Sequence, residues 1–228
     1  MISQLTVKQE SVRSIKLKTA DGVEIVGDYF SGVTDRGVLL LHMMPETRES
    51  WDEFALMLQE HGYHVLTIDL RGHGESEKGP DGYKRFSDQD HQSSRLDVDA
   101  AVDFLTASGA KHVFLIGASI GANLALQHLC SHTEIPAAVL FSPGLDYKGI
   151  ETLPLVKKLN PRQAAFFVGS RDDIRKDGWS NAEMVEELYK NCSGECDIKI
   201  FDDAGHGITI LKRYPSFAEE IMEWLEGR

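Results

Sequence analysis

The stretch from His112 to Cys130, HVFLIGASIGANLALQHLC, constrains this chain more than any other part of it. An uninterrupted apolar run at Val113–Ile116 predicts a buried strand, and Ala122–Cys130 predicts a helix. The pentapeptide GASIG joins them with the spacing G-x-S-x-G. A turn this sharp needs very small residues two positions on either side of the serine, and glycines stand there. The pattern therefore predicts a strained strand-to-helix turn that holds the Ser119 hydroxyl above the edge of a sheet.

The rest of the chain alternates apolar strand-like runs with helical segments. We expect further strands at Val12–Lys18, Val23–Phe30, Gly37–His42, His64–Leu70, Ala137–Ser142, Ala164–Gly169 and Asp197–Phe201. Helices are expected at Trp51–Glu60, Arg95–Ser108, Ala182–Lys190 and Ser216–Leu225. This alternation predicts an α/β fold, with a mostly parallel eight-stranded sheet and helices on both faces, in a single domain over residues 1–228. The first two strands are expected to form an antiparallel hairpin around Asp21-Gly22.

Charge and cysteine content exclude several classes of partner. The 24 basic and 36 acidic residues give a net charge of −12, which disfavours nucleic acids and anionic membrane surfaces. The three cysteines are an odd number, so we expect no disulfide framework and interpret Cys192 and Cys196 as incidental thiols in a turn. The N-terminal segment lacks an apolar region typical of a signal peptide, and no apolar run is long enough to span a bilayer. We therefore expect a cytoplasmic protein; its oligomeric state is not constrained.

Two polar clusters follow buried strands downstream of the serine. Gly169-Ser-Arg-Asp-Asp places Asp172 and Asp173 after one strand, and Asp202-Asp-Ala-Gly-His places His206 after the last strand. A serine hydroxyl is a weak nucleophile that needs a neighbouring histidine base, itself oriented by a carboxylate. Because the carboxyl ends of parallel strands meet at one edge of a sheet, these side chains are expected to lie close to Ser119.

Five motifs in order make the chain resemble the α/β-hydrolase superfamily, and within it the small bacterial esterase-like and dienelactone-hydrolase-like enzymes. They are LLLHMMPETRESW, IDLRGHGES, GASIG, GSRDD and AGHG, each placed after a predicted strand. The similarity extends from about Val12 to Trp224. The nucleophile position holds Ser119, whereas true dienelactone hydrolases carry a cysteine there.

The resemblance implies a role for each matching residue. Ser119 is the nucleophile, His206 the general base, and Asp172 the acid that orients the imidazole. Asp173 is the alternative acid; the family's usual spacing after the strand-end glycine favours Asp172.

The resemblance also implies an oxyanion hole formed by backbone N–H groups. The N–H of Ile120 is one expected donor, and that of Met44 or Met43 is the other. The chain departs from the family here, because His42-Met43-Met44 replaces the usual His-Gly-X. The remaining histidines, His42 and His73 among them, are interpreted as structural residues.

These observations predict a serine hydrolase that cleaves short-chain carboxylic esters through an acyl-enzyme, without a metal or cofactor. Leu145–Pro161, where related enzymes carry a cap, is short and contains two prolines, so only a short helix and a minimal cap are expected there. A thioesterase, amidase or peptidase with the same triad is the alternative within this class. A non-catalytic small-molecule receptor on the same fold is the alternative outside it.

Overall fold

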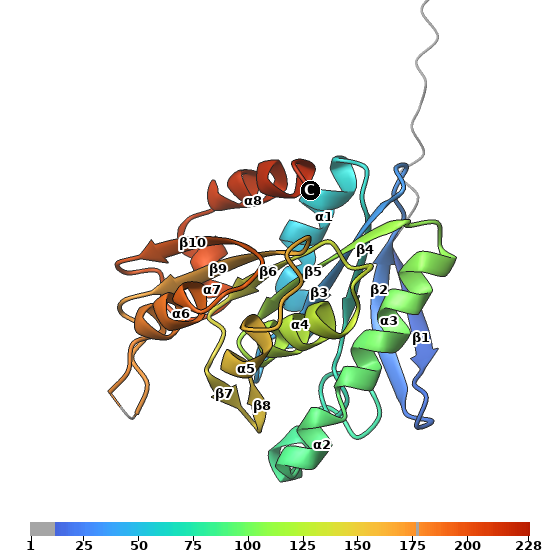
Figure 1. Ribbon diagram of the computed structural model, residues 1–228. Coiled ribbons are helices and arrows are strands. Elements are labelled where there is room, and N and C mark those ends of the chain that lie inside the picture. Colours follow the sequence, from blue (N-terminus) through green and yellow to red (C-terminus); the bar gives the residue numbers. More distant parts are fainter. Residues whose placement is uncertain (1–11, 177) are drawn as a thin grey trace, which may run out of the picture.

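The computed structural model describes residues 12–176 and 178–228, and its central feature is one eight-stranded sheet (Figure 1). The strand order is β1-β2-β4-β3-β5-β6-β9-β10. Strand β2 pairs antiparallel with both neighbours, and the strands from β4 to β10 run parallel to one another. The strands are β1 (Arg13–Lys18), β2 (Glu24–Phe30), β3 (Arg36–Leu41), β4 (His64–Ile68), β5 (His112–Ala118), β6 (Ala137–Phe141), β9 (Ala164–Ser170) and β10 (Glu195–Phe201).

Helices cover both faces of this sheet, which confirms the predicted α/β-hydrolase fold class (Figure 1). Helices α3, α4 and α6 pack on one face, whereas α1 and α8 pack on the other. The helices are η1 (Arg48–Trp51), α1 (Asp52–Glu60), η2 (Gly82–Arg85), α2 (Asp88–Gln92), α3 (Arg95–Ala107), α4 (Ile120–Ser131), α5 (Leu153–Val156), α6 (Asn181–Lys190), α7 (Thr209–Arg213) and α8 (Phe217–Glu226).

The sheet has a hydrophobic core on each face, because successive side chains of a strand point to opposite faces. In β3, Leu39 and Leu41 enter the core beneath α3 and α4, whereas Val38 and Leu40 enter the core beneath α1 and α8. All four side chains are fully buried. A strand covered on both faces therefore needs apolar residues at every position, which is why the central strands are unbroken apolar runs.

The segment between β6 and β9 forms more structure than the predicted short helix. It contains the two-stranded hairpin of β7 (Asp146–Tyr147) and β8 (Ile150–Glu151) before the short helix α5. The turn of this hairpin places Lys148 and Gly149 at positive φ, 57° and 77°. The added cover over the strand ends is thus a hairpin and a single helical turn, in line with a minimal cap.

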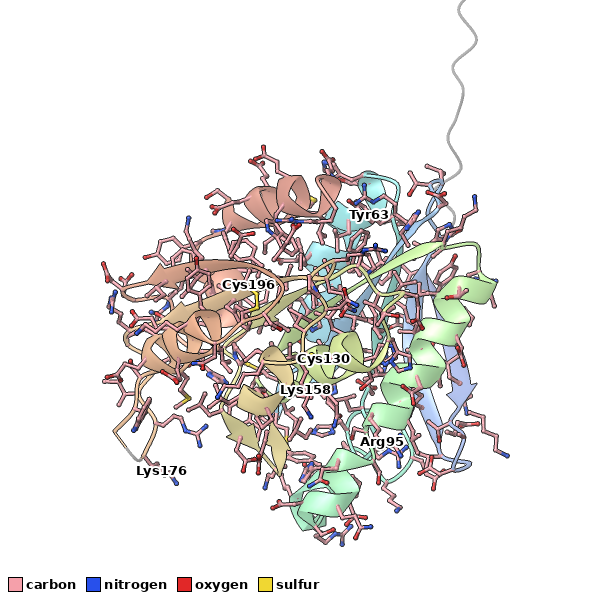
Figure 2. The ribbon with its side chains drawn as sticks, viewed as in Figure 1. Tyr63, Arg95, Cys130, Lys158, Lys176 and Cys196 are labelled. Atoms are coloured by element: carbon pink, nitrogen blue, oxygen red, sulfur yellow. A yellow bond between two sulfur atoms is a disulfide. The ribbon has the colours of Figure 1, made fainter. Side chains whose placement is uncertain are left out.

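The interpretation of Cys192 and Cys196 as incidental thiols is wrong. The structure joins their sulfur atoms in a disulfide, with the Cα atoms 6.5 Å apart (Figure 2). Residue Cys196 lies in β10, which begins at Glu195 and is therefore longer than the predicted Asp197–Phe201 strand. No helix within the described residues is long and apolar enough to cross a membrane.

Candidate active site

The turn between β5 and α4 has the strained geometry that its sequence predicts. Ser119 has a φ of 55° and a ψ of −117°, a conformation that costs a non-glycine residue about 1–3 kcal/mol. A Cβ atom at Gly117 would collide with the backbone of Gly121, and one at Gly121 would collide with the carbonyl of Leu41. The backbone N–H of Ser119 donates to the Phe141 carbonyl oxygen at 2.8 Å. Close packing of three backbone segments thus explains both glycines and holds the serine in place.

Helix α4 begins directly after the serine. The N–H groups of Ala122 and Asn123 donate to the Ser119 carbonyl oxygen, at 3.0 and 3.1 Å, and so close the first turn. Ile120 is the first helical residue, so its N–H is one of those that lack an acceptor within a helix. Such a group, at the positive end of the helix dipole, suits an oxyanion. Ile120 stays a predicted donor on this basis, and Met44, in the loop after β3, stays a prediction without such support.

His206 and Asp173 form the closest polar contact among the predicted site residues. His206 Nδ1–H donates to Asp173 Oδ2 at 2.6 Å. The Asp173 side chain is 15% exposed and that of His206 is 34% exposed. The Asp173 backbone is fixed as well, because its carbonyl oxygen accepts the N–H of Asn181 at the start of α6. This carboxylate therefore has the position from which an imidazole can be oriented.

The prediction that Asp172 orients His206 is wrong in this structure. Asp172 Oδ1 accepts hydrogen bonds from the Ser170 hydroxyl at 2.5 Å and the Gly205 N–H at 2.9 Å. Its other oxygen pairs with Arg213 at 3.1 Å. The Ser170 hydrogen bond is the main cause that lowers the pKa of Asp172. The carboxylate of Asp172 thus braces the loop before His206, and its neighbour reaches the imidazole.

Ser119 and His206 line one hollow of about 440 Å³ at the carboxyl end of the sheet. The other lining residues are Tyr147 of β7 and three residues of the loop between β9 and α6, Ile174, Arg175 and Lys176. Lys176 lies at the outer end of that loop (Figure 2). The structure therefore brings the predicted nucleophile and the predicted base to the same opening.

Tyr147 is a site residue that the sequence reasoning missed. It lines the same hollow as Ser119, and its ring packs on Gly144, where a Cβ atom would clash. The Arg175 guanidinium stands 5.2 Å from the ring centroid. Burial raises the pKa of Tyr147, against the lowering effect of Ser119. The phenol therefore stays protonated at neutral pH and can donate a hydrogen bond in the site.

Asn123 holds the segment that carries Tyr147. This fully buried side chain lies on α4, one turn after the serine. Its amide group donates to the carbonyl oxygens of Gly144 and Ile150, at 3.1 and 2.9 Å, and its oxygen accepts the Gly144 N–H at 3.0 Å. A buried amide with this many partners fixes the β7–β8 hairpin against the helix of the nucleophile.

Ser142 supports the loop of the predicted base in a similar way. It follows β6 at a positive φ of 48°, and its hydroxyl accepts the N–H of Gly207 at 2.8 Å. Gly207, itself at a φ of 58°, lies against the Met43 thioether. The methionine that replaces the usual glycine after His42 thus points toward the loop that carries His206.

His42 and His73 make contacts that fit the structural role predicted for them. His42 is fully buried, and its Nε2 accepts the Leu70 N–H at 3.0 Å. His73 stacks on Tyr83 with ring centroids 4.1 Å apart. Burial lowers the pKa of His73 to about 4, helped by the neighbouring His42. Both rings are therefore neutral and hold the loops after β3 and β4.

Comparison with known proteins supports the fold and the motif. Residues 33–191 match the family model described as serine aminopeptidase, S33, and this range contains Ser119 and Asp173. The chain belongs to this family of α/β-hydrolases. The matched range ends before His206, which is placed in the site by the structure alone.

Curated relatives resemble this chain over about half of its length. A non-heme haloperoxidase from Rhodococcus erythropolis is 32% identical over 114 residues, which are 50% of this chain and 37% of that protein. Epoxide hydrolase B from Mycobacterium tuberculosis is 32% identical over 118 residues, 51% of this chain and 31% of the relative. The chain thus spans well under two thirds of these relatives.

Solved esterase structures share the fold over nearly the whole chain. The Pyrococcus furiosus esterase Pf2001 superposes with a TM-score of 0.78 and 23% identity, covering 95% of this chain and 92% of the esterase. An acetyl xylan esterase from Paenibacillus sp. R4 gives a TM-score of 0.77 at 17% identity, covering 99% and 86%. At these identities the likeness shows the architecture.

Proposed function

We propose that this protein is a serine hydrolase that cleaves short-chain carboxylic esters through an acyl-enzyme. The observation that carries the proposal is the 2.6 Å hydrogen bond between His206 and Asp173, at the hollow that Ser119 also lines. A serine on a strained turn, a histidine and an orienting carboxylate make up the machinery of serine hydrolases, recognised by geometry and not by sequence position.

In the proposed reaction, His206 takes the hydroxyl proton of Ser119 as the oxygen attacks the ester carbonyl carbon. The N–H groups of Ile120 and Met44 stabilise the resulting oxyanion. His206 then gives the proton to the leaving alcohol, and an acyl group stays on Ser119. Water attacks this acyl group with His206 again as the base, which releases the acid and restores the hydroxyl. Throughout, Asp173 holds the imidazole in the required tautomer and stabilises its protonated form.

The limited cover over the site favours small acyl groups. The segment between β6 and β9 adds only a two-stranded hairpin and one helical turn, so it gives a long alkyl chain little apolar wall. The hollow is lined partly by the polar side chains of Arg175 and Lys176. Each methylene group of the acyl chain that stays in water loses about 0.8 kcal/mol of binding free energy. Esters with acyl groups from acetyl to butyryl are therefore the proposed substrates.

A fluorophosphonate probe tests the proposed nucleophile. The folded protein is incubated with the probe, and its intact mass and peptide map are recorded. We expect one adduct on Ser119 and none in the Ser119→Ala variant. Folded protein that stays unlabelled would favour the non-catalytic receptor instead.

A peptidase or amidase is the second candidate, because the matching family model is described as serine aminopeptidase. Matched butyryl derivatives of one leaving group, as ester, thioester and anilide, separate these activities. We expect the highest kcat/KM for the ester. A faster anilide would assign the site to amide hydrolysis.

The cellular location is open to a direct test. The cysteine count predicts a cytoplasmic protein, whereas the Cys192–Cys196 disulfide is a feature that persists mainly in oxidising compartments. Alkylation of free thiols in freshly lysed cells, followed by mass spectrometry, decides between them. Labelled Cys192 and Cys196 would support the cytoplasmic location, and protected cysteines would contradict it.

A further inference from the structure

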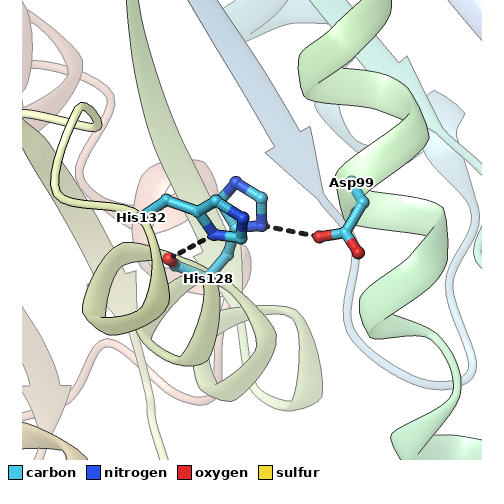
Figure 3. A group of neighbouring side chains, drawn as sticks. All are labelled: Asp99, His128 and His132. Atoms are coloured by element: carbon cyan, nitrogen blue, oxygen red, sulfur yellow. Dashed lines mark hydrogen bonds and ion pairs between the residues drawn. The ribbon is translucent and has the colours of Figure 1, made fainter.

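A cluster of three potential metal ligands lies away from the proposed active site. Asp99 projects from α3, His128 lies near the end of α4, and His132 directly follows that helix (Figure 3). One potential ligand atom from each residue lies within 4.8 Å of those of the other two. The two histidines are four residues apart, so they share one face of the helix.

The spacing within this cluster suits a metal ion. His128 Nδ1 and Asp99 Oδ1 are 3.1 Å apart. Two nitrogen or oxygen ligands bound to tetrahedral zinc at about 2.0–2.1 Å are separated by about 3.3 Å. A cation could thus replace the shared proton of this pair with little movement. The largest separation, 4.8 Å, would have to close by about 1.5 Å. The Asp99 side chain is 38% exposed and His132 is partly exposed, so both have room to move.

The hydrogen bonds of the two rings also suit metal binding. His132 Nδ1–H donates to the His128 carbonyl oxygen at 3.1 Å, which leaves the His132 Nε2 lone pair available. Metal-bound histidines are commonly held through a hydrogen bond of the other ring nitrogen. The two rings stack with centroids 3.9 Å apart.

The ring of His128 is incompletely bonded by the protein. The residue is 6% exposed, and within the described part of the chain its buried Nε2 has no hydrogen-bond partner. An ion that bound Nδ1 in place of the proton shared with Asp99 would leave the ring proton of His128 on this Nε2.

We propose that Asp99, His128 and His132 bind one divalent transition-metal ion, zinc by preference. Two imidazoles and a carboxylate form a ligand set that zinc accepts, with water in the remaining position. The bound ion would tie the end of α4 to α3. Helix α4 rises about 14 Å between Ser119 and His128, so this site is separate from the proposed ester hydrolysis.

Metal titration of the full chain tests the proposal. The purified protein is stripped with a chelator and dialysed, then titrated with Zn²⁺ by calorimetry and with Co²⁺ by visible absorption. We expect saturation at one ion per chain and a Co²⁺ spectrum of a nitrogen- and oxygen-bound ion. The variants His132→Gln and Asp99→Asn are each expected to weaken Zn²⁺ binding at least tenfold.

His61→Gln is the matched control. His61 also bonds through Nδ1 to a carbonyl oxygen four residues earlier, that of Met57, but it is not part of the cluster. Its removal is expected to leave Zn²⁺ binding unchanged. The changed positions His132 and Asp99 are partly exposed, so folded protein is expected, with circular dichroism as the check. Binding of equal strength in all four proteins, or no binding to the wild type, would overturn the proposal.

Discussion

Replacement of Asp173 with asparagine tests which of the two adjacent carboxylates after β9, Asp172 or Asp173, orients His206. Asparagine has nearly the same shape, but its amide lacks the negative charge that holds the His206 Nδ1 proton. The wild-type bond of 2.6 Å is short for a nitrogen–oxygen pair, and Asp173 is 15% exposed, so water screens the interaction weakly. Loss of such a carboxylate in a serine triad lowers kcat by about 10⁴, or about 5.4 kcal/mol at 1.36 kcal/mol per factor of ten.

The change of Asp172 to asparagine is the matched control, since it removes the same charge one residue away. Its pair with Arg213 joins side chains that are 36% and 50% exposed, and such surface pairs contribute about 0–1 kcal/mol. Asparagine can still accept the hydrogen bonds of Ser170 and the Gly205 N–H. We therefore expect turnover of Asp172→Asn within about tenfold of the wild type.

The test measures the initial rates of both variants with p-nitrophenyl butyrate at pH 8. Their thermal midpoints are measured beside the rates. We expect kcat to differ by about 10³ or more between the two variants. Equal losses, or a larger loss in Asp172→Asn with an intact fold, would refute the role given to Asp173.

The remaining predictions concern the site and the core. Ser119→Ala and His206→Ala are each expected to lower ester turnover about 10⁴-fold or more with thermal midpoints near the wild type; substantial turnover by the pure serine variant would contradict this. In a p-nitrophenyl ester series, kcat/KM is expected to be higher for butyrate than for dodecanoate. Asn123→Ala is expected to reduce the free energy of unfolding by about 1–3 kcal/mol in urea titrations, because it leaves buried backbone groups unpaired. Burial raises the pKa of Asp97 to about 6 against the lowering effect of its three hydrogen bonds from Arg71, so its contribution to stability is present below about pH 4 and is lost as pH rises through 6. In unfolding titrations from pH 4 to 7, Asp97→Asn is expected to lack this decline.

The fold could be predicted because its signals are local. Each central strand is a short apolar run, and residues such as Leu39 and Leu40 must both be buried whichever face they enter. The Ser119 turn is marked by its own pentapeptide, although only the collision at Gly117 arises within the turn, whereas that at Gly121 is with Leu41 of β3. Strand ends were predicted less well, since pairing with a neighbour decides them; β10 starts at Glu195 because that residue pairs with Ala164.

The choice between Asp172 and Asp173 depends on contacts that spacing does not encode. Both follow the same strand, and either carboxylate could reach a histidine after β10. The decision comes from Ser170 and Arg213, which hold Asp172 toward the loop before His206. Ser170 lies only two residues before Asp172, but Arg213 lies 41 residues after it, so spacing after the strand does not identify this pair of contacts. The same reason explains why Tyr147 was missed: a hairpin in a presumed connector brings it to the serine.

The methionine after His42 illustrates how a departure from a family motif is accommodated. A side chain at position 43 needs space that glycine would leave empty, and that space lies beside Gly207. Because Gly207 has no side chain and a φ of 58°, the Met43 thioether can lie where a Cβ atom would otherwise stand. Both residues flank the proposed site, one after β3 and the other after His206. A larger residue at 207 would therefore displace either Met43, next to the predicted oxyanion donor, or the predicted base.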